Sequence, residues 1–528
     1  MKRLFTALRS LTVIVCWPLL GAIPAPEGLT CRVGDQCVVL HWDRLREPDL
    51  AGYKVYRAGS STGPWTLLTP TLLTFPALCD FEAVNGCTNA YRITAVTRAA
   101  QESAPSKTLE AAARPFADDD AFLEFVQRAS FDYFWREANP TNGLIPDRSP
   151  STSPCSIAAV GFGLSALCVG VDRGWITRAE GAARVQTTLA TFGSGPQGPE
   201  TSGTIGHKGW FYHFLDMTAA RRYVKFNTEL SSIDTALLLA GVLHARQFFD
   251  QTNPGEASLR AAADAILGRV DWRWMAPDTD VLSMGWHPDS GFLPARWVGY
   301  NEAMLLCLLA LGAASDPLPP SAWERWTGGY TWTTHYGHAF VPFPPLFGHQ
   351  YSHCWVDFRR VADPFMTRHR STYFENSRRA TLAQHAYCTA NPLRHPGYSG
   401  DLWGLTACDG PAGYAARGAP PALHDDGTIA PTAAGGSIVF APELAIPTLR
   451  RFYREFRRSL WTPYGFRDAF NLGAAWWGPD TLGIDQGPFV LMIENHRTGR
   501  VWQRFMRSPE IQRGLARAGF VAVQTSVP

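Results

Sequence analysis

The spacing of hydrophobic residues divides the chain into two parts. Between residue 26 and about residue 113, apolar and polar residues alternate with a period of two, as in residues 37–42, 52–57 and 90–96. Turns rich in glycine, proline and serine separate these segments at the spacing typical of β-sandwiches. We therefore predict a small all-β sandwich over residues 26–113.

After a linker at residues 111–118 the hydrophobic period changes to 3.6, which indicates helices. Four expected amphipathic helices cover residues 119–137, 177–193, 256–270 and 443–459. Thr177 and Glu180 have the spacing of a capping box at the start of the second. Four other segments are apolar on almost every side: residues 156–171, 230–243, 303–313 and 484–493.

A helix that is apolar on every side is buried on every side. Inner buried helices and outer amphipathic helices therefore alternate along the chain, as an (α/α)6 toroid requires. The fold class that we predict is mainly α, with a toroid over residues 114–528 that follows the β-sandwich. No clear sequence repeat is visible, so the number of six helix pairs is inferred from the length of this region.

The first residues of the chain have the pattern of a secretory signal. Lys2, Arg3 and Arg9 precede an apolar run over residues 11–20, which predicts a signal peptide over residues 1–25. No later segment has about 18 uninterrupted apolar residues, so we expect no membrane span. The mature protein is then periplasmic or secreted.

The cysteines fit an oxidising compartment. Cys31 and Cys37 flank one short turn, and Cys79 and Cys87 bracket another. Close pairs of this kind predict local disulfides, Cys31–Cys37 and Cys79–Cys87.

Composition narrows the possible partners. The 48 Lys and Arg residues nearly balance 46 Asp and Glu residues, for a net charge of +2, so nucleic acid is not an expected partner. The 19 Trp, 16 Tyr and 30 Phe residues suit a large core or a surface that stacks on sugars. His349 and His353 have i,i+4 spacing, but no HExxH or CxxC motif accompanies them, so we expect no metal or cofactor. We expect a monomer.

Acidic residues stand at the starts of three of the predicted inner helices. They are Glu229, Glu302 and Asp485. Inner helices of an up-down toroid run parallel, so their N-termini meet at one mouth and bring the three acids together. Paired carboxyl groups are what glycosidic cleavage needs. For each acid taken alone, a helix cap that the dipole stabilises is the favoured interpretation, and the coincidence of three such acids argues against it.

The helix dipole also suggests roles for these acids. A carboxylate at a helix N-terminus is held ionised, which favours a base, whereas an acid must be kept protonated by burial or by negative neighbours. Aromatic and polar loops between the helices offer sugar contacts. The candidate substrate-binding residues in these loops are Trp286, Arg296, His349, Trp355, Arg359, Trp403 and Trp477. For any single tryptophan, a purely structural place in the core is the favoured interpretation.

The N-terminal region resembles a fibronectin type III domain. The resemblance is carried by Trp42, by Gly-Tyr-Lys-Val-Tyr-Arg at residues 52–57, by residues 90–96 and by Glu-Ser-Ala-Pro-Ser at residues 102–106. It covers about 85 residues, and it implies a spacer module or a glycan-binding module.

The remaining residues resemble the glycoamylase-like domain family. The motifs that carry the resemblance occur in order at residues 229–241, 299–303, 345–353, 426–434, 464–470, 483–488 and 492–499. The family has an (α/α)6 toroid fold, and its characterised relatives are bacterial β-1,2-glucanases of glycoside hydrolase family 144 and related families. The resemblance implies an exported β-1,2-glucanase that releases sophoro-oligosaccharides with inversion of the anomeric centre.

The motifs also imply residue roles. Glu302 in Tyr-Asn-Glu matches the general acid, and Asp485 in Gly-Ile-Asp-Gln-Gly-Pro matches the base. Glu229, Asp234 and Tyr351 are expected to line the sugar subsites together with His349, Trp355 and Arg359. The alternatives are a transglycosylase, an α-glucan hydrolase on the same toroid, and a non-catalytic glycan-binding protein. Endo or exo action stays open.

Overall fold

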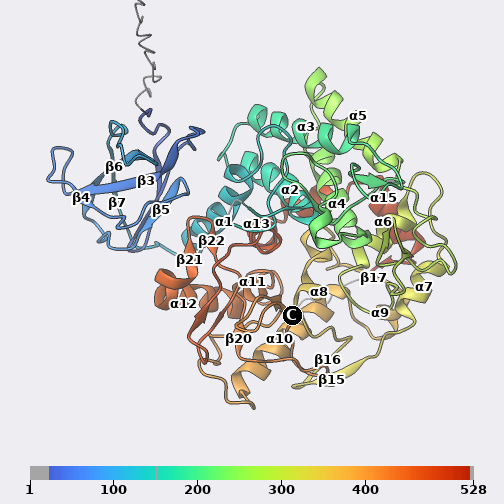
Figure 1. Ribbon diagram of the computed structural model, residues 1–528. Helices are drawn as coiled ribbons and strands as arrows, with labels where there is room; N and C mark the ends of the chain where they lie inside the picture. Colours follow the sequence, from blue (N-terminus) through green and yellow to red (C-terminus); the bar gives the residue numbers. More distant parts are fainter. Residues whose placement is uncertain (1–22, 150–151, 524–528) are drawn as a thin grey trace, which may run out of the picture. The chain divides into compact units, whose positions relative to one another are not determined.

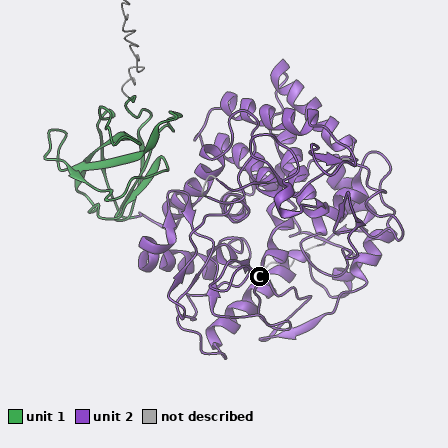
Figure 2. Ribbon diagram, in the orientation of Figure 1, with its two compact units in different colours: residues 1–115 green, residues 116–528 purple. Residues whose placement is uncertain are grey.

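The computed structural model describes residues 23–149 and 152–523. Residues 1–22 of the predicted signal peptide lie outside the described part. The chain forms two compact units, Met1–Pro115 and Phe116–Pro528 (Figure 2). Within the described residues, no helix is both long enough and apolar enough to cross a membrane.

The first unit consists of two antiparallel sheets. The three-stranded sheet has the order β1 (Thr30–Gly34), β2 (Cys37–His41), β5 (Ala77–Asp80). The four-stranded sheet has the order β4 (Thr66–Leu67), β3 (Leu50–Ala58), β6 (Thr88–Thr97), β7 (Leu109–Ala112). Side chains from both sheets form one core, to which β2 gives Val38 and Leu40, β3 gives Tyr53 and β6 gives Tyr91 and Ile93. The alternation in the sequence therefore corresponds to inward and outward positions of facing strands.

The two predicted disulfides are wrong, because Cys31, Cys37 and Cys87 are free thiols in the described part of the chain. Cys31 pairs in register with Leu40 and Cys37 with Gly34. The two cysteines are therefore about 10 Å apart along the hairpin and point to opposite faces, beyond the reach of a disulfide. Cys79 lies on β5 in one sheet, whereas Cys87 directly precedes β6 in the other.

The second unit is mainly helical, and its inner helices are buried along nearly their whole length. These helices are α2 (Ile157–Asp172), α4 (Ser232–Phe248), α6 (Met304–Gly312), α11 (Pro431–Gly435) and α13 (Gly483–Arg497). Each of the four segments predicted to be apolar all round is one of these helices, within a few residues at the ends.

Helices with one exposed face surround them (Figure 1). They include α1 (Asp119–Arg136), α3 (Arg178–Ser194), α5 (Pro254–Gly268), α12 (Pro442–Leu460) and α15 (Pro509–Arg517). The remaining helices are α7 (Ser321–Thr327), α8 (Phe347–Gln350), α9 (Pro364–Arg368), α10 (Tyr373–Ala390) and α14 (Arg500–Phe505), with 3₁₀ turns at Val224–Phe226 and Ser352–Cys354. The predicted capping box is present, since Thr177 Oγ1 accepts from Glu180 N and Glu180 Oε2 accepts from Thr177 N.

Helices α2 and α4 approach so closely that only glycine fits between their backbones. A Cβ on Gly161 would lie 2.1 Å from the carbonyl oxygen of Leu237, and a Cβ on Gly241 would lie 2.1 Å from that of Gly161. These glycines therefore set the distance between two inner helices.

Short strand pairs lie between the helices and connect their ends. They are β8 (Cys155–Ser156) with β11 (Phe214–Leu215), β9 (Gly206–His207) with β10 (Trp210–Phe211), β15 (Thr333–His335) with β16 (His338–Phe340), β17 (Val361–Ala362) with β25 (Val521–Ala522), β18 (Ala407–Cys408) with β19 (Ala415–Ala416), and β21 (Trp461–Thr462) with β22 (Gly465–Phe466). Two three-stranded sheets are β12 (Leu230–Ser231), β13 (Gly285–His287), β14 (Gly291–Phe292), and β20 (Thr428–Ile429), β23 (Phe470–Asn471), β24 (Trp476–Trp477). Strands β8, β12 and β20 directly precede the inner helices α2, α4 and α11.

Candidate active site

The N-termini of the inner helices meet at one end of the second unit. Phe214 pairs with Ser156 before α2, and Tyr212 pairs with Leu230 before α4. Arg148 forms an isolated β-bridge with Leu482, which directly precedes α13. Thr432 in α11 lies close enough to α13 for its Oγ1 to donate to the carbonyl of Asp485, at 3.4 Å. Acids from distant parts of the sequence are thereby brought to the same region.

Glu302 lies two residues before α6, in a turn that Ser352 holds by hydrogen bonds. Ser352 Oγ donates to the backbone carbonyl of Glu302 at 3.0 Å and accepts from Leu305 N. The Glu302 side chain is half-buried, and within the described chain its Oε2 has no hydrogen-bond partner. Burial raises the pKa of this carboxyl to about 7, and the negative charge of Asp234 adds to the rise. Glu302 therefore holds its proton up to near-neutral pH.

Asp485, in the first turn of α13, faces a second acid, Asp468. Both side chains are almost fully buried, at 4% and 1% exposure. The two carboxyl groups interact, and neither Asp468 Oδ1 nor Asp485 Oδ2 has a hydrogen-bond partner among the described residues. Burial, followed by the charge of Asp468, raises the pKa of Asp485 well above its ordinary value, and burial raises the pKa of Asp468 to about 7. The expectation that the helix terminus holds Asp485 ionised is thus wrong.

The backbone of Asp409 holds Asp468, and Asp409 belongs to a cluster of charged residues around Arg148. The backbone N–H of Asp409 donates to Asp468 Oδ2 at 2.7 Å. Arg148 is the cation of this cluster, with ion pairs to Asp409 (2.7 Å), Asp147 (3.3 Å) and Asp480 (3.3 Å). One guanidinium thus offsets three carboxylates beside the acid pair, which leaves excess negative charge near Asp485 and favours its protonated form.

His213 lies between the two acids that begin α4. Its Nδ1 is 2.9 Å from Glu229 Oε1, and its Nε2 is 3.5 Å from Asp234 Oδ1. Burial opposes a charge on the ring, but Asp234, Glu229 and Asp147 outweigh it and raise the pKa of His213 to about 9. In turn the hydrogen bond and charge of His213 keep the pKa of Glu229 below its ordinary value although burial opposes this. Glu229 is therefore ionised while Glu302 is protonated.

Tyr351 connects the two groups of acids. It is half-buried, and burial, followed by the charges of Asp485, Tyr414 and Glu302, raises its pKa well above the ordinary value. The charges of Asp485 and Glu302 thus act on the same phenol. The predicted residues Glu229, Asp234, Glu302, Tyr351 and Asp485 are thus in one region of the second unit.

Three predicted sugar contacts are wrong, because their side chains are buried in the core. His349, Trp355 and Trp403 are each 0% exposed. The indole of Trp355 stacks on Phe162 and donates to Ser165 Oγ at 2.8 Å. His349 accepts from the backbone of Phe343. A substrate cannot reach these side chains.

The prediction that Arg359 lines a sugar subsite is also wrong. It pairs with Asp357 at 2.8 Å and lies over the ring of Trp502 at 4.4 Å. Trp502 belongs to α14, which follows the C-terminal end of α13, whereas Asp485 is at the N-terminal end. A helix of 15 residues is about 22 Å long, so Arg359 is at the opposite end of α13 from the acids.

The remaining three predicted contacts are half-exposed. Trp286 on β13 pairs with Leu230 on β12, which is the residue after Glu229. Its indole packs against His207 and Trp274. Arg296 donates to Ser283 Oγ at 3.1 Å and to the backbone of its own loop. Trp477 stacks on Phe470 at 5.2 Å. Their exposure leaves a role in sugar binding as a prediction.

Sequence reasoning missed Asp468, His213 and Tyr414. Asp468 lies in the motif at residues 464–470 and His213 in the aromatic loop at residues 210–214, both of which stand out in the sequence. Neither follows the pattern of an acid before an apolar helix, so the pattern could not select them.

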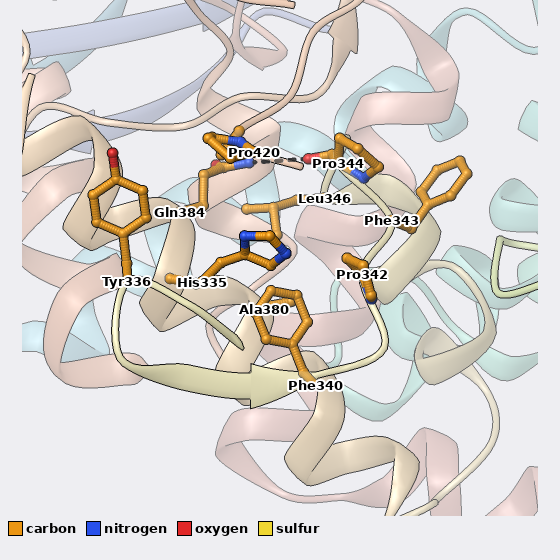
Figure 3. A pocket seen from close by; sticks show the side chains of 12 residues that line it. His335, Tyr336, Phe340, Pro342, Phe343, Pro344, Leu346, Ala380, Gln384 and Pro420 are labelled. Carbon is orange, nitrogen blue, oxygen red and sulfur yellow. Dashed lines mark hydrogen bonds between the residues drawn. The ribbon is translucent and has the colours of Figure 1, made fainter. Parts of the chain in front are cut away.

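A small cavity beside β15 and β16 is not a sugar site (Figure 3). Its volume of about 10 Å³ holds no more than a single water molecule. The lining residues include His335, Tyr336, Phe340, Pro342 and Gln384, and no carboxylate is among them. Gln384 Nε2 donates to the carbonyl of Pro344 across it, at 3.5 Å. In the described residues, no group of three or more His, Cys, Asp or Glu side chains is arranged to hold a metal ion.

Comparison with known proteins gives concordant matches. Residues 294–509 match the family described as "Putative glucoamylase". The exo β-1,2-glucooligosaccharide sophorohydrolase (non-reducing end) of Parabacteroides distasonis is 31% identical, over 94% of this chain and 71% of the relative's chain.

Solved structures agree with the sequence matches. The crystal structure of a β-1,2-glucanase from Parabacteroides distasonis has a TM-score of 0.86 and 29% identity, and covers 94% of this chain and 73% of its own. The endo-β-1,2-glucanase from Chitinophaga pinensis, in complex with sophorotriose and glucose, has a TM-score of 0.71 and 28% identity, over 77% of this chain and 99% of its own. The second unit thus has the fold of enzymes that cleave glycosidic bonds.

Proposed function

Since the chain belongs to the glycoamylase-like family and is a glycoside hydrolase, we propose that it cleaves β-1,2-linked glucan and releases sophorose from the non-reducing end. The observation that carries this proposal is one protonated carboxyl, Glu302, in the same region as a second acid pair, Asp468 and Asp485. Such an arrangement supplies both the acid and the base of glycosidic hydrolysis. The exo direction in this proposal comes from the name of the Parabacteroides relative, which is 31% identical over 94% of the chain.

In the proposed reaction, Glu302 is the general acid. Its carboxyl proton moves to the glycosidic oxygen as the bond to the anomeric carbon breaks. A pKa of about 7 keeps the proton available at neutral pH, and because desolvation disfavours the carboxylate that forms, this carboxylate readily takes up a proton again.

Asp485 is the proposed base, and Asp468 determines when it can act. The proton that the pair shares must be on Asp468 for Asp485 to accept one from the attacking water. Water then adds to the anomeric carbon from the face opposite the leaving oxygen, and the product has the inverted configuration. After the step the pair holds two protons and Glu302 none, so one proton returns through water before the next turnover.

The acids at the start of α4 are proposed to bind sugar hydroxyls. The protonated His213 keeps Glu229 ionised and ready to accept hydrogen bonds. Trp286 offers a half-exposed ring near Glu229 for contact with a sugar face.

The proposal also includes the fold of both units and the export of the chain. Alternating buried and amphipathic helices support an (α/α)6 toroid for the second unit. The three- and four-stranded sheets of the first unit support a fibronectin type III-like module over residues 26–113. The residues at 1–25 support export to the periplasm or the medium.

A product profile tests the proposal. The protein is incubated with linear β-1,2-glucan, cyclic β-1,2-glucan and maltodextrin, and the early products are separated by chromatography. We expect sophorose from the linear glucan and none from maltodextrin. Cleavage of maltodextrin alone would establish an α-glucan hydrolase, and affinity for the glucan without any product would establish a binding protein.

The direction and the stereochemistry are tested on labelled oligosaccharides. With a fluorophore at the reducing end, exo action shortens the labelled chain by two glucose units at a time. Proton NMR of the first product should give the α-anomer from the β-linkage. Retention of the β-anomer, or longer labelled products, would identify a transglycosylase.

A further inference from the structure

A tyrosine on a tightly held hairpin lies beside the acids but has no partner of its own. The hairpin consists of β18 and β19, where Ala407 pairs with Ala416 and Cys408 with Ala415. Tyr414 directly precedes β19 and is 68% exposed. Nothing in the sequence pattern selects it, since it lies in a loop between glycine-rich turns.

The hairpin is held by a buried arginine. Arg417 is 1% exposed, and it forms two hydrogen bonds of 2.8 Å with the carboxylate of Asp426. The same guanidinium donates to the carbonyls of Cys408 (2.6 Å), Ala415 (3.4 Å) and Gly413 (3.4 Å). A fully desolvated cation with this number of acceptors fixes the loop on both sides of Tyr414.

This hairpin places the phenol among the catalytic candidates. Tyr414 directly precedes Ala415, and Asp409 directly follows Cys408, which pairs with Ala415, so the register sets Tyr414 across from Asp409. The backbone N–H of Asp409 donates to Asp468 Oδ2 at 2.7 Å. Burial raises the pKa of Tyr414 to about 12, with further contributions from the Cys408 thiol and from Glu302, Asp468 and Asp485. The charge of the Tyr414 hydroxyl in turn contributes to the raised pKa of Tyr351. Tyr414 is therefore on the hairpin whose backbone contacts Asp468, and the charges of the acids act on its hydroxyl.

The hydroxyl of Tyr414 makes no hydrogen bond to any residue that the structure describes. An aromatic face that is open to solvent and a phenol with an unused donor, held rigidly beside two acids, match what a sugar requires: a surface for its apolar face and a partner for a hydroxyl. A structural role would require the ring to pack or the hydroxyl to pair, and neither is the case.

We propose that Tyr414 is a substrate-contacting residue, whose ring covers the glucosyl unit next to the bond that is cleaved and whose hydroxyl binds one of its hydroxyl groups. The inference rests on the proposed hydrolysis of β-1,2-glucan. It adds a specificity-determining residue that comes from the β18–β19 hairpin rather than from the start of an inner helix.

The test compares Tyr414→Ala and Tyr414→Phe with the wild type on linear β-1,2-gluco-oligosaccharides. The Ala variant loses both contacts, and we expect its KM to rise about tenfold or more. The Phe variant keeps the ring and loses the hydroxyl, and we expect a rise of about threefold. The matched control is Tyr336→Ala, which removes a tyrosine that is 40% exposed beside the β15–β16 hairpin and does not line the acids; its KM should equal that of the wild type.

A binding measurement separates affinity from chemistry. Calorimetry with a β-1,2-linked glucose tetramer is performed on Glu302→Gln and on Glu302→Gln combined with Tyr414→Ala. A Kd that is about tenfold weaker in the double variant supports the proposal, and equal Kd values with equal melting temperatures overturn it. If the wild type does not cleave the oligosaccharide at all, the proposed function fails instead, so the two failures are distinguishable.

Discussion

Glu302 and Asp485 both stand at starts of inner helices, yet burial rather than the helix dipole determines their charge. A dipole stabilises a carboxylate by about 0.3–1 kcal/mol. The rise in the pKa of Glu302 from 4.5 to about 7 corresponds to about 3 kcal/mol against the ionised form. Desolvation therefore exceeds the dipole, and the same holds for Asp485, where the charge of Asp468 adds to burial.

The protonation of Glu302 predicts the alkaline limb of the pH profile. Glu302 acts only with its proton, which is fully present below about pH 6 and is lost as the pH rises through about 7. We expect kcat/KM to fall tenfold per pH unit above this value. A wild-type profile that stays flat to pH 9 would exclude Glu302 as the acid.

The same shift predicts a gain in stability when Glu302 is replaced by Gln. The folded protein disfavours the carboxylate, so the wild type loses stability between pH 4.5, the pKa of an unfolded glutamate, and about pH 7. Glu302→Gln should match the wild type in the free energy of unfolding at pH 4 and exceed it at pH 8 by at most ~3 kcal/mol. An equal difference at both pH values would show that the shift is absent.

At the scale of elements, the contact between α2 and α4 depends on two glycines. In Gly241→Ala the new Cβ would lie 2.1 Å from the Gly161 carbonyl, and the backbone cannot yield without moving a helix. We expect a loss of ~1–3 kcal/mol or more in the free energy of unfolding. Chemical denaturation measures this loss.

The matched control is Gly193→Ala in α3, where a Cβ would meet nothing within 4 Å. This substitution should be neutral or stabilise the protein by up to ~1 kcal/mol. Equal stabilities for the two alanine variants would contradict a close approach between α2 and α4.

Hydrophobic periodicity identified the elements with a clear apolar pattern and missed those with buried polar residues. All eight predicted helices are present. Helix α10 was not predicted, because its buried face includes Asn376, Ser377, Thr381 and Gln384. Asn376 bonds to the backbone of Val341, and Gln384 to that of Leu405. Their partners come from distant loops, which a local pattern cannot show.

The site was predictable to a similar extent. The acids before apolar helices follow from position alone, and Glu229, Glu302 and Asp485 are in one region. Aromatic residues do not reveal on which side of the chain they are buried, so Trp355 and Trp403 were assigned to the sugar although both belong to the core. Asp468 and Tyr414 lie in loops, and their positions depend on long-range contacts of Asp409 and Arg417.

At the scale of the whole molecule, all the candidate site residues belong to the second unit. We expect a protein that begins at residue 114 to keep its helical circular dichroism and to cleave linear β-1,2-oligosaccharides. Loss of cleavage with an intact fold would show that the first unit contributes a part of the site. The full-length protein, purified in the same way, is the control.

The most direct test of the account measures cleavage of linear β-1,2-glucan by Glu302→Gln and Asp485→Asn. The control is Glu324→Gln, which changes an exposed glutamate on α7. We predict that kcat falls by about 10²–10⁴ in each of the two acid variants, while the control keeps the activity of the wild type and all the variants keep their folded circular dichroism. Either acid variant with activity within tenfold of the wild type would contradict the central claim that these two carboxyl groups cleave the glycosidic bond.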